Sequence, residues 1–239
     1  MGLIGERVLV LGGTSGIGLA TAALAAAEGA QVVVVSSRRT SVDRALAELP
    51  AGSTGEVADL GDPTAVEDLF ERIGVVDHIA FTAGEPLTLL AVDGMDLDAA
   101  RAAFGLRFFG ALAAVSVGAR HVRPGGSITL TTGIAAERPG AGWSVAASIC
   151  GAVVSLVRAL AVELAPLRVN GVSPGVVRSP LWAGMDDAAR EQMYADTAKA
   201  LPVGRVGEPS DIAQVYIHLM KQQFTTGTTI TVDGGAVLV

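Results

Sequence analysis

Cysteine, histidine and positive charge are all scarce in this chain of 239 residues. The chain has 1 cysteine, Cys150, so no internal disulfide forms, and its 3 histidines are too scattered for a metal site. We therefore expect a cytoplasmic protein that holds no metal. The formal net charge of −7 would repel polyanions, and the largest basic cluster is the pair Arg38 and Arg39. Nucleic acid is not an expected partner.

Targeting and membrane signals are also missing. The chain enters an expected strand by Val8 without a basic leader or a small-residue cleavage site, so we expect no signal peptide. The 19 residues Pro139–Val157 carry no charge and are long enough to cross a bilayer. Their glycines and serines instead favour a buried or interface helix, so no membrane partner is expected.

Apolar β-branched runs alternate with alanine-rich helical stretches along the whole chain, which is typical of βαβ units around a parallel sheet. Half of the residues are apolar, enough for the core of one large α/β domain. The expected strands are Arg7–Leu11, Gln31–Val35, Gly55–Ala58, Asp77–Thr82, Ser127–Thr132, Arg168–Val172 and Thr228–Val232. The expected helices are Gly16–Glu28, Val42–Leu49, Pro63–Ile73, Asp96–His121, Ser144–Leu164 and Pro209–Met220.

Right-handed crossovers between these units predict a doubly wound parallel sheet of seven strands with helices on both faces. Residues 1–239 are thus expected to form a single Rossmann domain, with ligand bound at the carboxyl ends of the strands, between the first and fourth. The longest irregular stretch runs from about Pro174 to Arg205 and is expected to contain a short helix. Its residues 176–205 are predicted to form a lid over the substrate.

A glycine cluster, Gly12-Gly13-Thr14-Ser15-Gly16-Ile17-Gly18, follows the first expected strand and opens a helix. Gly12 permits a tight turn, Gly16 lets the backbone approach a pyrophosphate, and Gly18 lets the helix pack on the strand. The amino terminus of that helix would stabilise the charge of a phosphate. This pattern predicts a dinucleotide-binding site.

The spacing G-x-x-x-G-x-G resembles that of the short-chain dehydrogenase/reductase family. Three further stretches resemble the same family, in order and at its spacing, over nearly the whole chain: Ala58-Asp59-Leu60, Arg168–Gly175, and Gly204–Ile212 followed by Thr226-Gly227 and Val232–Gly235. The resemblance implies that Asp59 bonds the adenine and that the Pro174-Gly175 turn packs on the nicotinamide. It implies cofactor binding by Gly12, Thr14, Ser15, Gly16, Ile17, Gly18, Asp59, Leu60, Thr82, Ala83, Gly84, Pro174, Gly175, Val177 and Ser179.

The end of the second expected strand decides which dinucleotide is preferred. NAD-specific members of the family usually have an acidic residue there, whereas this chain has Ser36, Ser37 and Arg38. A carboxylate would repel a 2′-phosphate, while hydroxyls and a guanidinium bond it. NADP(H) is therefore the expected cofactor, with NAD(H) as the alternative. A structural alternative is that the arginines only solvate the start of a helix.

The groups that carry proton transfer in this family are missing. Its members use a tyrosine and, four residues later, a lysine on one helix face, with a serine and an asparagine nearby. The matching positions here are occupied by Ala146, Cys150, Gly133 and Arg107. No local misalignment supplies the pair, because the first tyrosine is Tyr194 and the first lysine is Lys199. The chain is thus identified as a divergent member that lacks the Asn-Ser-Tyr-Lys tetrad.

Arg107, Thr132 and Ser144 are the candidates to replace this chemistry. An unpaired buried guanidinium costs several kcal/mol, so Arg107 is expected to bond the nicotinamide ribose, a backbone carbonyl or an anionic substrate group. Thr132 and Ser144 would offer hydroxyl groups, and Tyr194 would reach in from the lid. Structural alternatives are a side chain that only extends to the surface or a structural ion pair for Arg107, a strand end for Thr132 and a helix N-cap for Ser144. For Tyr194 the alternative is surface packing.

Two functions are consistent with these residues. The first is an NADP(H)-dependent oxidoreductase that acts on a small or medium apolar carbonyl, imine or alcohol with a non-standard proton donor. The second is a catalytically silent NADP(H)-binding protein that serves as a sensor or partner subunit. The helices Asp96–His121 and Ser144–Leu164 are too apolar to face water, so we expect a homotetramer or homodimer.

Overall fold

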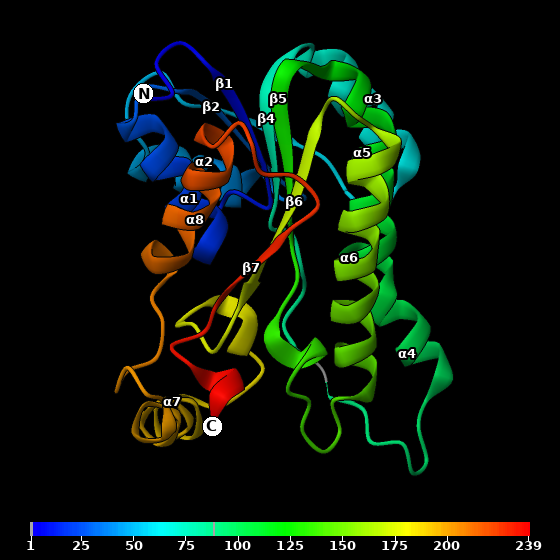
Figure 1. Ribbon diagram of the computed structural model, residues 1–239, viewed down its shortest axis with the longest axis vertical. Helices are drawn as coiled ribbons and strands as arrows, with labels where there is room; N and C mark the ends of the chain where they lie inside the picture. Colours follow the sequence, from blue (N-terminus) through cyan, green and yellow to red (C-terminus); the bar gives the residue numbers. More distant parts are fainter. Residues whose placement is uncertain (1, 88) are drawn as a thin grey trace.

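A single parallel sheet forms the centre of the molecule in a computed structural model that describes residues 2–87 and 89–239 (Figure 1). The strands stand in the order β3-β2-β1-β4-β5-β6-β7, with all neighbours parallel. Their order reverses between β1 and β4, so the predicted doubly wound, seven-stranded fold is confirmed. Their bounds are Arg7–Leu11 (β1), Gln31–Ser36 (β2), Thr54–Val57 (β3), Val76–Phe81 (β4), Val122–Thr131 (β5), Arg168–Pro174 (β6) and Thr229–Val232 (β7).

Runs of buried apolar side chains explain why these segments form central strands. In β1 and β2, the residues Val8–Leu11 and Val32–Val35 are all buried. A parallel strand that is covered by helices on both faces needs apolar side chains at successive positions. The strand β5 begins at Val122 rather than at the predicted Ser127, because Val122 pairs with Val76 ahead of a register shift.

Helices cover both faces of the sheet (Figure 1). One face carries α1 (Gly16–Ala27), α2 (Arg39–Glu48) and α8 (Pro209–Lys221). The other carries α3 (Pro63–Ile73), α4 (Leu97–Phe104), α5 (Ala111–Gly118) and α6 (Ser144–Glu163). Each face has its own hydrophobic core, and the larger side chains of the two cores include Tyr216 and Ile217 on the first face and Leu69, Phe70 and Val157 on the second.

Two helical segments on the second face, Leu97–His121 and Ser144–Glu163, have the length and composition of membrane spans. Here they pack on the sheet through core residues such as Val115, Val153 and Val157. Only 33% of the most apolar window of each segment is buried. A broad surface of small and apolar side chains therefore remains on the outer side of these helices.

The predicted helix Asp96–His121 is not regular. It consists of α4, a π-helix η1 (Gly105–Gly110), α5 and a 3-10 turn η2 (Ala119–His121). The ring of Phe108 meets those of its neighbours Phe104 and Phe109 edge to face around this turn. A π-turn within a helix often marks a functional site. Arg107 lies in the middle of the π-helix η1.

The segment after β6 is more regular than predicted. The short helix expected there is η4 (Pro180–Trp182) followed by the longer α7 (Asp187–Ala200), which has 14 residues. The side chain of Asp186 caps α7 by accepting a hydrogen bond from the Ala189 backbone N–H at 2.9 Å. Buried Trp182, Tyr194 and Val206 give this segment a small core of its own.

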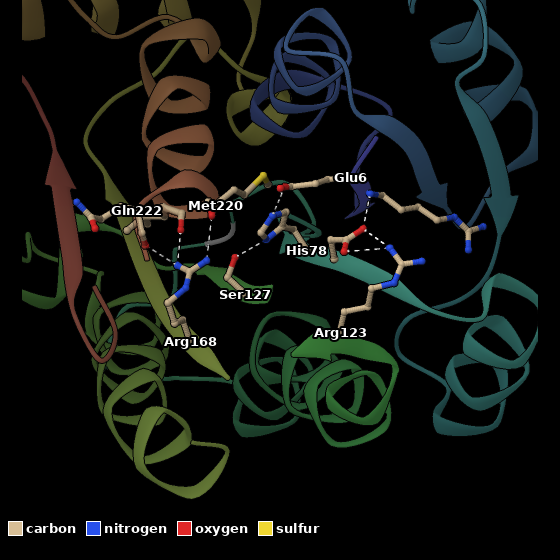
Figure 2. Close-up of polar contacts among 10 residues, drawn as sticks. Glu6, His78, Arg123, Ser127, Arg168, Met220 and Gln222 are labelled. Atoms are coloured by element: carbon tan, nitrogen blue, oxygen red, sulfur yellow. Dashed lines mark hydrogen bonds and ion pairs between the residues drawn. The ribbon is translucent and has the colours of Figure 1, made fainter. Parts of the chain in front are cut away.

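A buried polar network ties together the amino ends of the central strands (Figure 2). His78 of β4 is 3% exposed, and its Nδ1 lies 2.8 Å from Ser127 Oγ while its Nε2 lies 2.8 Å from Glu6 Oε2. Nearby, the guanidinium of Arg168 donates to the carbonyl of Met220 at 2.9 Å, in the last turn of α8. These bonds satisfy buried polar groups at the amino ends of the strands, at the end of the sheet opposite the predicted ligand site.

Candidate functional site

A large cavity opens at the carboxyl ends of the strands. Its volume is about 1110 Å³, and its walls include the segments that follow β1, β2, β3, β4, β5 and β6, together with η1, α6 and η4. Small-molecule pockets usually measure roughly 300–1,000 Å³. The cavity therefore has room for a large cofactor with a substrate beside it.

The glycine turn after β1 forms one end of this cavity. Gly12 has a φ of +86°, and a Cβ added to it would lie 2.5 Å from the backbone nitrogen of Ala83. A Cβ on Gly18 would lie 2.2 Å from the carbonyl oxygen of Gly12, so both positions exclude a side chain. The helix α1 begins at Gly16, and its N-cap residue Ser15 makes no side-chain cap. Its first N–H groups are thus available to an anion.

The structure brings the predicted cofactor-binding residues to one cavity. They enter it from the glycine turn, from the end of β2, from the segments after β3 and β4, and from the turn after β6. They are Gly12, Thr14, Ser15, Gly16, Ile17, Gly18, Ser36, Ser37, Arg38, Asp59, Leu60, Thr82, Ala83, Gly84, Pro174, Gly175, Val177 and Ser179.

Two arginines stand at the β2 end of the cavity. Arg38 is the N-cap residue of α2, and Arg44 lies on the same helix and also lines the cavity. Within the described parts of the chain, neither guanidinium has a hydrogen-bond or ion-pair partner, whereas the neighbouring Arg39 pairs with Asp43. Sequence reasoning missed Arg44 because it began this helix at Val42 and did not orient the helix toward the cavity.

Two of the three predicted catalytic residues, Arg107 and Thr132, line the other half of the cavity. Ser144 does not: it is exposed on the first turn of α6, where Val145 and Ala146 take the positions that face the cavity. The prediction of a catalytic Ser144 is therefore corrected. Its alternative role as N-cap is not observed either, because Trp143 holds that position without a side-chain cap.

Tyr194 does not reach the cavity. Its side chain is 3% exposed within the small core of the segment after β6, and the Arg178 guanidinium lies 4.4 Å above its ring. The hydroxyl of the other tyrosine, Tyr216, bonds the Thr131 hydroxyl. Among the described residues that line the cavity, none is a tyrosine, lysine or histidine.

The Arg107 guanidinium reaches from η1 to the segment after β4. Its Nη2 donates a hydrogen bond to the Glu85 carbonyl oxygen, a backbone carbonyl being one of the three predicted kinds of partner. A Cβ on Gly84 would lie 2.8 Å from Arg107 Nη1, so a residue without a side chain is needed beside it. Burial lowers the pKa of Arg107, while the charge of Glu85 and the thiol of Cys150 act to raise it.

The wall formed by α6 presents small side chains to the cavity. Ala146 and Cys150 are one helical turn apart and both line the cavity. The Thr132 hydroxyl donates to the Cys150 carbonyl oxygen at 2.9 Å. Burial is the main cause that raises the pKa of the Cys150 thiol, which therefore stays protonated near neutral pH.

Three loops join to form a roof over this half of the cavity. The backbone N–H of Leu87 donates to the Leu181 carbonyl at 2.8 Å, and that of Leu90 donates to the Gly142 carbonyl at 3.1 Å. Of the predicted lid, Val176, Val177 and residues 179–183 line the cavity, and the described residues from Gly184 to Arg205 do not.

Further lining residues were missed by sequence reasoning. They are Glu85, Arg138 and Trp143, which face this half of the cavity beside Trp182 of the predicted lid. Each of them lies in a loop or a short 3-10 turn, for which no periodic pattern indicates an inward side.

Comparison with known proteins connects this site to a family. The model of the SDR-like Rossmann domain matches residues 2–239. The chain is 34% identical to the short-chain dehydrogenase/reductase ATR9 of Stachybotrys chlorohalonatus, over 98% of each of the two chains.

Solved structures give the same result. The crystal structure of a small-chain dehydrogenase in complex with NADPH has a TM-score of 0.88 and 39% identity, over 98% of this chain and 100% of that one. The MalC reductase/Diels-Alderase from Malbranchea aurantiaca has a TM-score of 0.91 and 30% identity, over 99% and 98% of the two chains. The chain therefore belongs to the short-chain dehydrogenase/reductase family.

Proposed function

We propose that this chain is an NADP(H)-dependent oxidoreductase that transfers hydride to or from an apolar carbonyl, imine or alcohol without the tyrosine and lysine usual in its family. One observation carries the proposal: a single cavity runs from the glycine turn and Arg38 to Arg107 and Thr132. A dinucleotide in the first half would meet a substrate in the second.

The residues of the first half fit a phosphorylated dinucleotide. The turn without side chains at Gly12 and Gly18, together with the open amino end of α1, suits a pyrophosphate. Arg38 and Arg44, which lack partners among the described residues, suit a 2′-phosphate. When bound, NADPH supplies the hydride. The NADPH complex of a dehydrogenase with a similar fold supports this choice over NADH.

Arg107 takes the place of the missing positive charge in this proposal. A preorganised guanidinium stabilises the negative charge that develops on a substrate oxygen or nitrogen during hydride transfer. Arg107 keeps its proton near neutral pH although burial lowers its pKa. The Thr132 proton is already donated to the Cys150 carbonyl, so this hydroxyl is left as an acceptor for water or for an O–H or N–H group of the substrate. The proton must then come from water.

Turnover is expected to be slow but real. The loss of a positioned general acid slows a reaction typically ~10²–10⁴-fold. Holding two reactants in line is worth about 7–11 kcal/mol, which is more than that loss. Hydride transfer therefore depends on the cavity and on Arg107, and it proceeds slowly without a fixed general acid.

The second half of the cavity favours an apolar substrate. Its walls include Leu87, Ile134, Trp143, Ile149 and Trp182, with few hydrogen-bonding groups among them. A polyol bound there would leave several hydroxyls without partners, at a cost of about 1–3 kcal/mol each. A ketone, aldehyde or cyclic imine on an apolar skeleton has no such cost.

The proposal is tested by measuring NADPH oxidation by the protein with a panel of apolar aldehydes, ketones and cyclic imines. Mass spectrometry identifies the ligands that co-purify with the protein. We expect turnover of at least one class and co-purified NADP(H). The alternative, a silent NADP(H)-binding protein, predicts cofactor binding with no turnover of any member of the panel.

A further inference from the structure

Arginines without a partner gather in the cavity. Elsewhere in the described chain an arginine usually has a carboxylate, as in the pairs of Arg178 with Glu191 at 2.9 Å and of Arg205 with Asp211 at 2.6 Å. The side chains that make no hydrogen bond or ion pair with any described residue include Arg38, Arg44, Arg138 and Arg158, and the first three of these line the cavity. In a chain with a net charge of −7, acidic partners are not in short supply.

The third of these arginines lies far from the expected 2′-phosphate site. Arg138 follows the turn η3 (Ile134–Ala136) after β5, and its backbone N–H donates to the Ile134 carbonyl at 2.8 Å. The strand β5 stands three positions from β2 in the sheet, which is about 14 Å at ~4.8 Å per strand. The pyrophosphate site at α1 also belongs to the other half of the cavity. Cofactor phosphates therefore do not account for Arg138.

The surroundings of Arg138 are apolar and aromatic. The chain turns back at Gly140, where a Cβ would lie 3.1 Å from the Trp143 ring, and Leu87 and Trp182 also line this half of the cavity. Arg138 itself is exposed at the rim, whereas Arg107 lies deeper and is held by the Glu85 carbonyl. A ligand in this half would thus contact apolar walls, with the Arg107 guanidinium deep in the cavity and the Arg138 guanidinium at its rim.

We propose that Arg138 binds a carboxylate of the substrate, which is then an apolar, ring-containing carbonyl or imine that also carries an acid group. The guanidinium fork matches a carboxylate in two parallel hydrogen bonds, and no described acidic residue forms an ion pair with it. The reacting carbon then lies toward Arg107 and the apolar skeleton lies against the indoles. This inference rests on the proposed function and assigns the substrate class of that site.

Two isosteric probes test the inference on the NADP⁺-loaded protein: biphenyl-4-carboxylate and the neutral biphenyl-4-carboxamide. Calorimetry measures their affinities. Quenching of tryptophan emission locates them, because the chain has 2 tryptophans and both line the cavity. The variants are Arg138→Gln, Arg138→Lys and the matched control Arg158→Gln, which removes an exposed arginine of α6 that does not line the cavity.

The native protein should bind the carboxylate about tenfold more tightly than the amide, as expected for one charge-assisted contact. Arg138→Gln should abolish the preference, Arg138→Lys should keep part of it, and Arg158→Gln should leave it unchanged. Equal affinities in the native protein, an unaltered preference in Arg138→Gln, or no binding of either probe would each overturn the inference. NADPH binding and turnover are measured on the same samples, so failure of the proposed function is seen separately.

Discussion

Arg38 and Arg44 are the residues that should decide between NADPH and NADH. Both guanidiniums line the β2 end of the cavity and lack partners among the described residues. We expect the native protein to bind NADPH at least about tenfold more tightly than NADH, and Arg38→Ala or Arg44→Ala to remove about 1–2 kcal/mol of that preference. Calorimetry with both cofactors measures it, with Arg158→Ala as the control. Equal affinities in the native protein would rule out the choice of NADP(H).

Arg107 should matter for turnover more than for folding or cofactor binding. Arg107→Met keeps the length of the side chain and removes the charge and the hydrogen bond to the Glu85 carbonyl. We expect kcat to fall about 10²-fold with an NADPH affinity within about threefold of native, because the lost interaction forms in the transition state. A variant that folds, binds NADPH and turns over at the native rate would show that Arg107 is structural.

Single residues were predictable where a motif fixes them. Gly12 and Gly18 follow from the turn they must form, and Arg107 follows from the cost of a charge among phenylalanines. Ser144 was misplaced because a helix-start signal does not tell which way the side chain faces. A binding role for Arg138 could not be predicted from the sequence, because it depends on which groups surround the side chain, and only the fold shows them.

At the level of elements, the buried network at the amino ends of the strands should make stability depend on pH. Burial is the main cause that lowers the pKa of His78, partly offset by its hydrogen bond to Glu6. Arg168 and Asp77 also act on this ring, the first lowering and the second raising the pKa. Below about pH 6.5 the unfolded chain gains a proton that the folded chain resists. The stabilisation is thus present above pH 6.5 and is lost as pH falls toward the lowered pKa.

Unfolding by urea between pH 7.5 and pH 5 measures this effect. The free energy of unfolding should fall by up to about 1.4 kcal/mol per pH unit through His78 alone. His78→Gln should flatten this slope, although it lowers stability overall. A slope that His78→Gln does not alter would exclude His78 as its source.

Regular elements were predictable and irregular ones were not. The strands appear as β-branched runs because a parallel strand buried on both faces has few other options. The π-helix at Gly105–Gly110 was not predicted, because its apolar residues fit a regular α-helix equally well. The length of helix α7 was underestimated, because the helix is polar on most sides and lacks an apolar stripe.

At the level of the whole molecule, the outer surfaces of the helices on the second face should be covered by copies of the same chain. Val162 on α6 is 81% exposed and Phe109 on η1 is 60% exposed, beside many small residues. We expect a homodimer or homotetramer at micromolar concentration by light scattering. Val162→Glu and Phe109→Glu should weaken the assembly, while Ile4→Glu, at the amino edge of the sheet, should not. A monomeric native protein would refute this expectation.

A cavity without tyrosine or lysine among its described lining residues should still transfer hydride. Mass spectrometry of products formed with NADPH deuterated at the transferable position tests it most directly, because slow transfer leaves a stable label. We expect deuterium on the carbon of a reduced apolar carbonyl or imine with the native protein, and much less with Arg107→Met. If the native protein binds NADPH tightly and no product of any class carries deuterium, the protein binds the cofactor without transferring hydride.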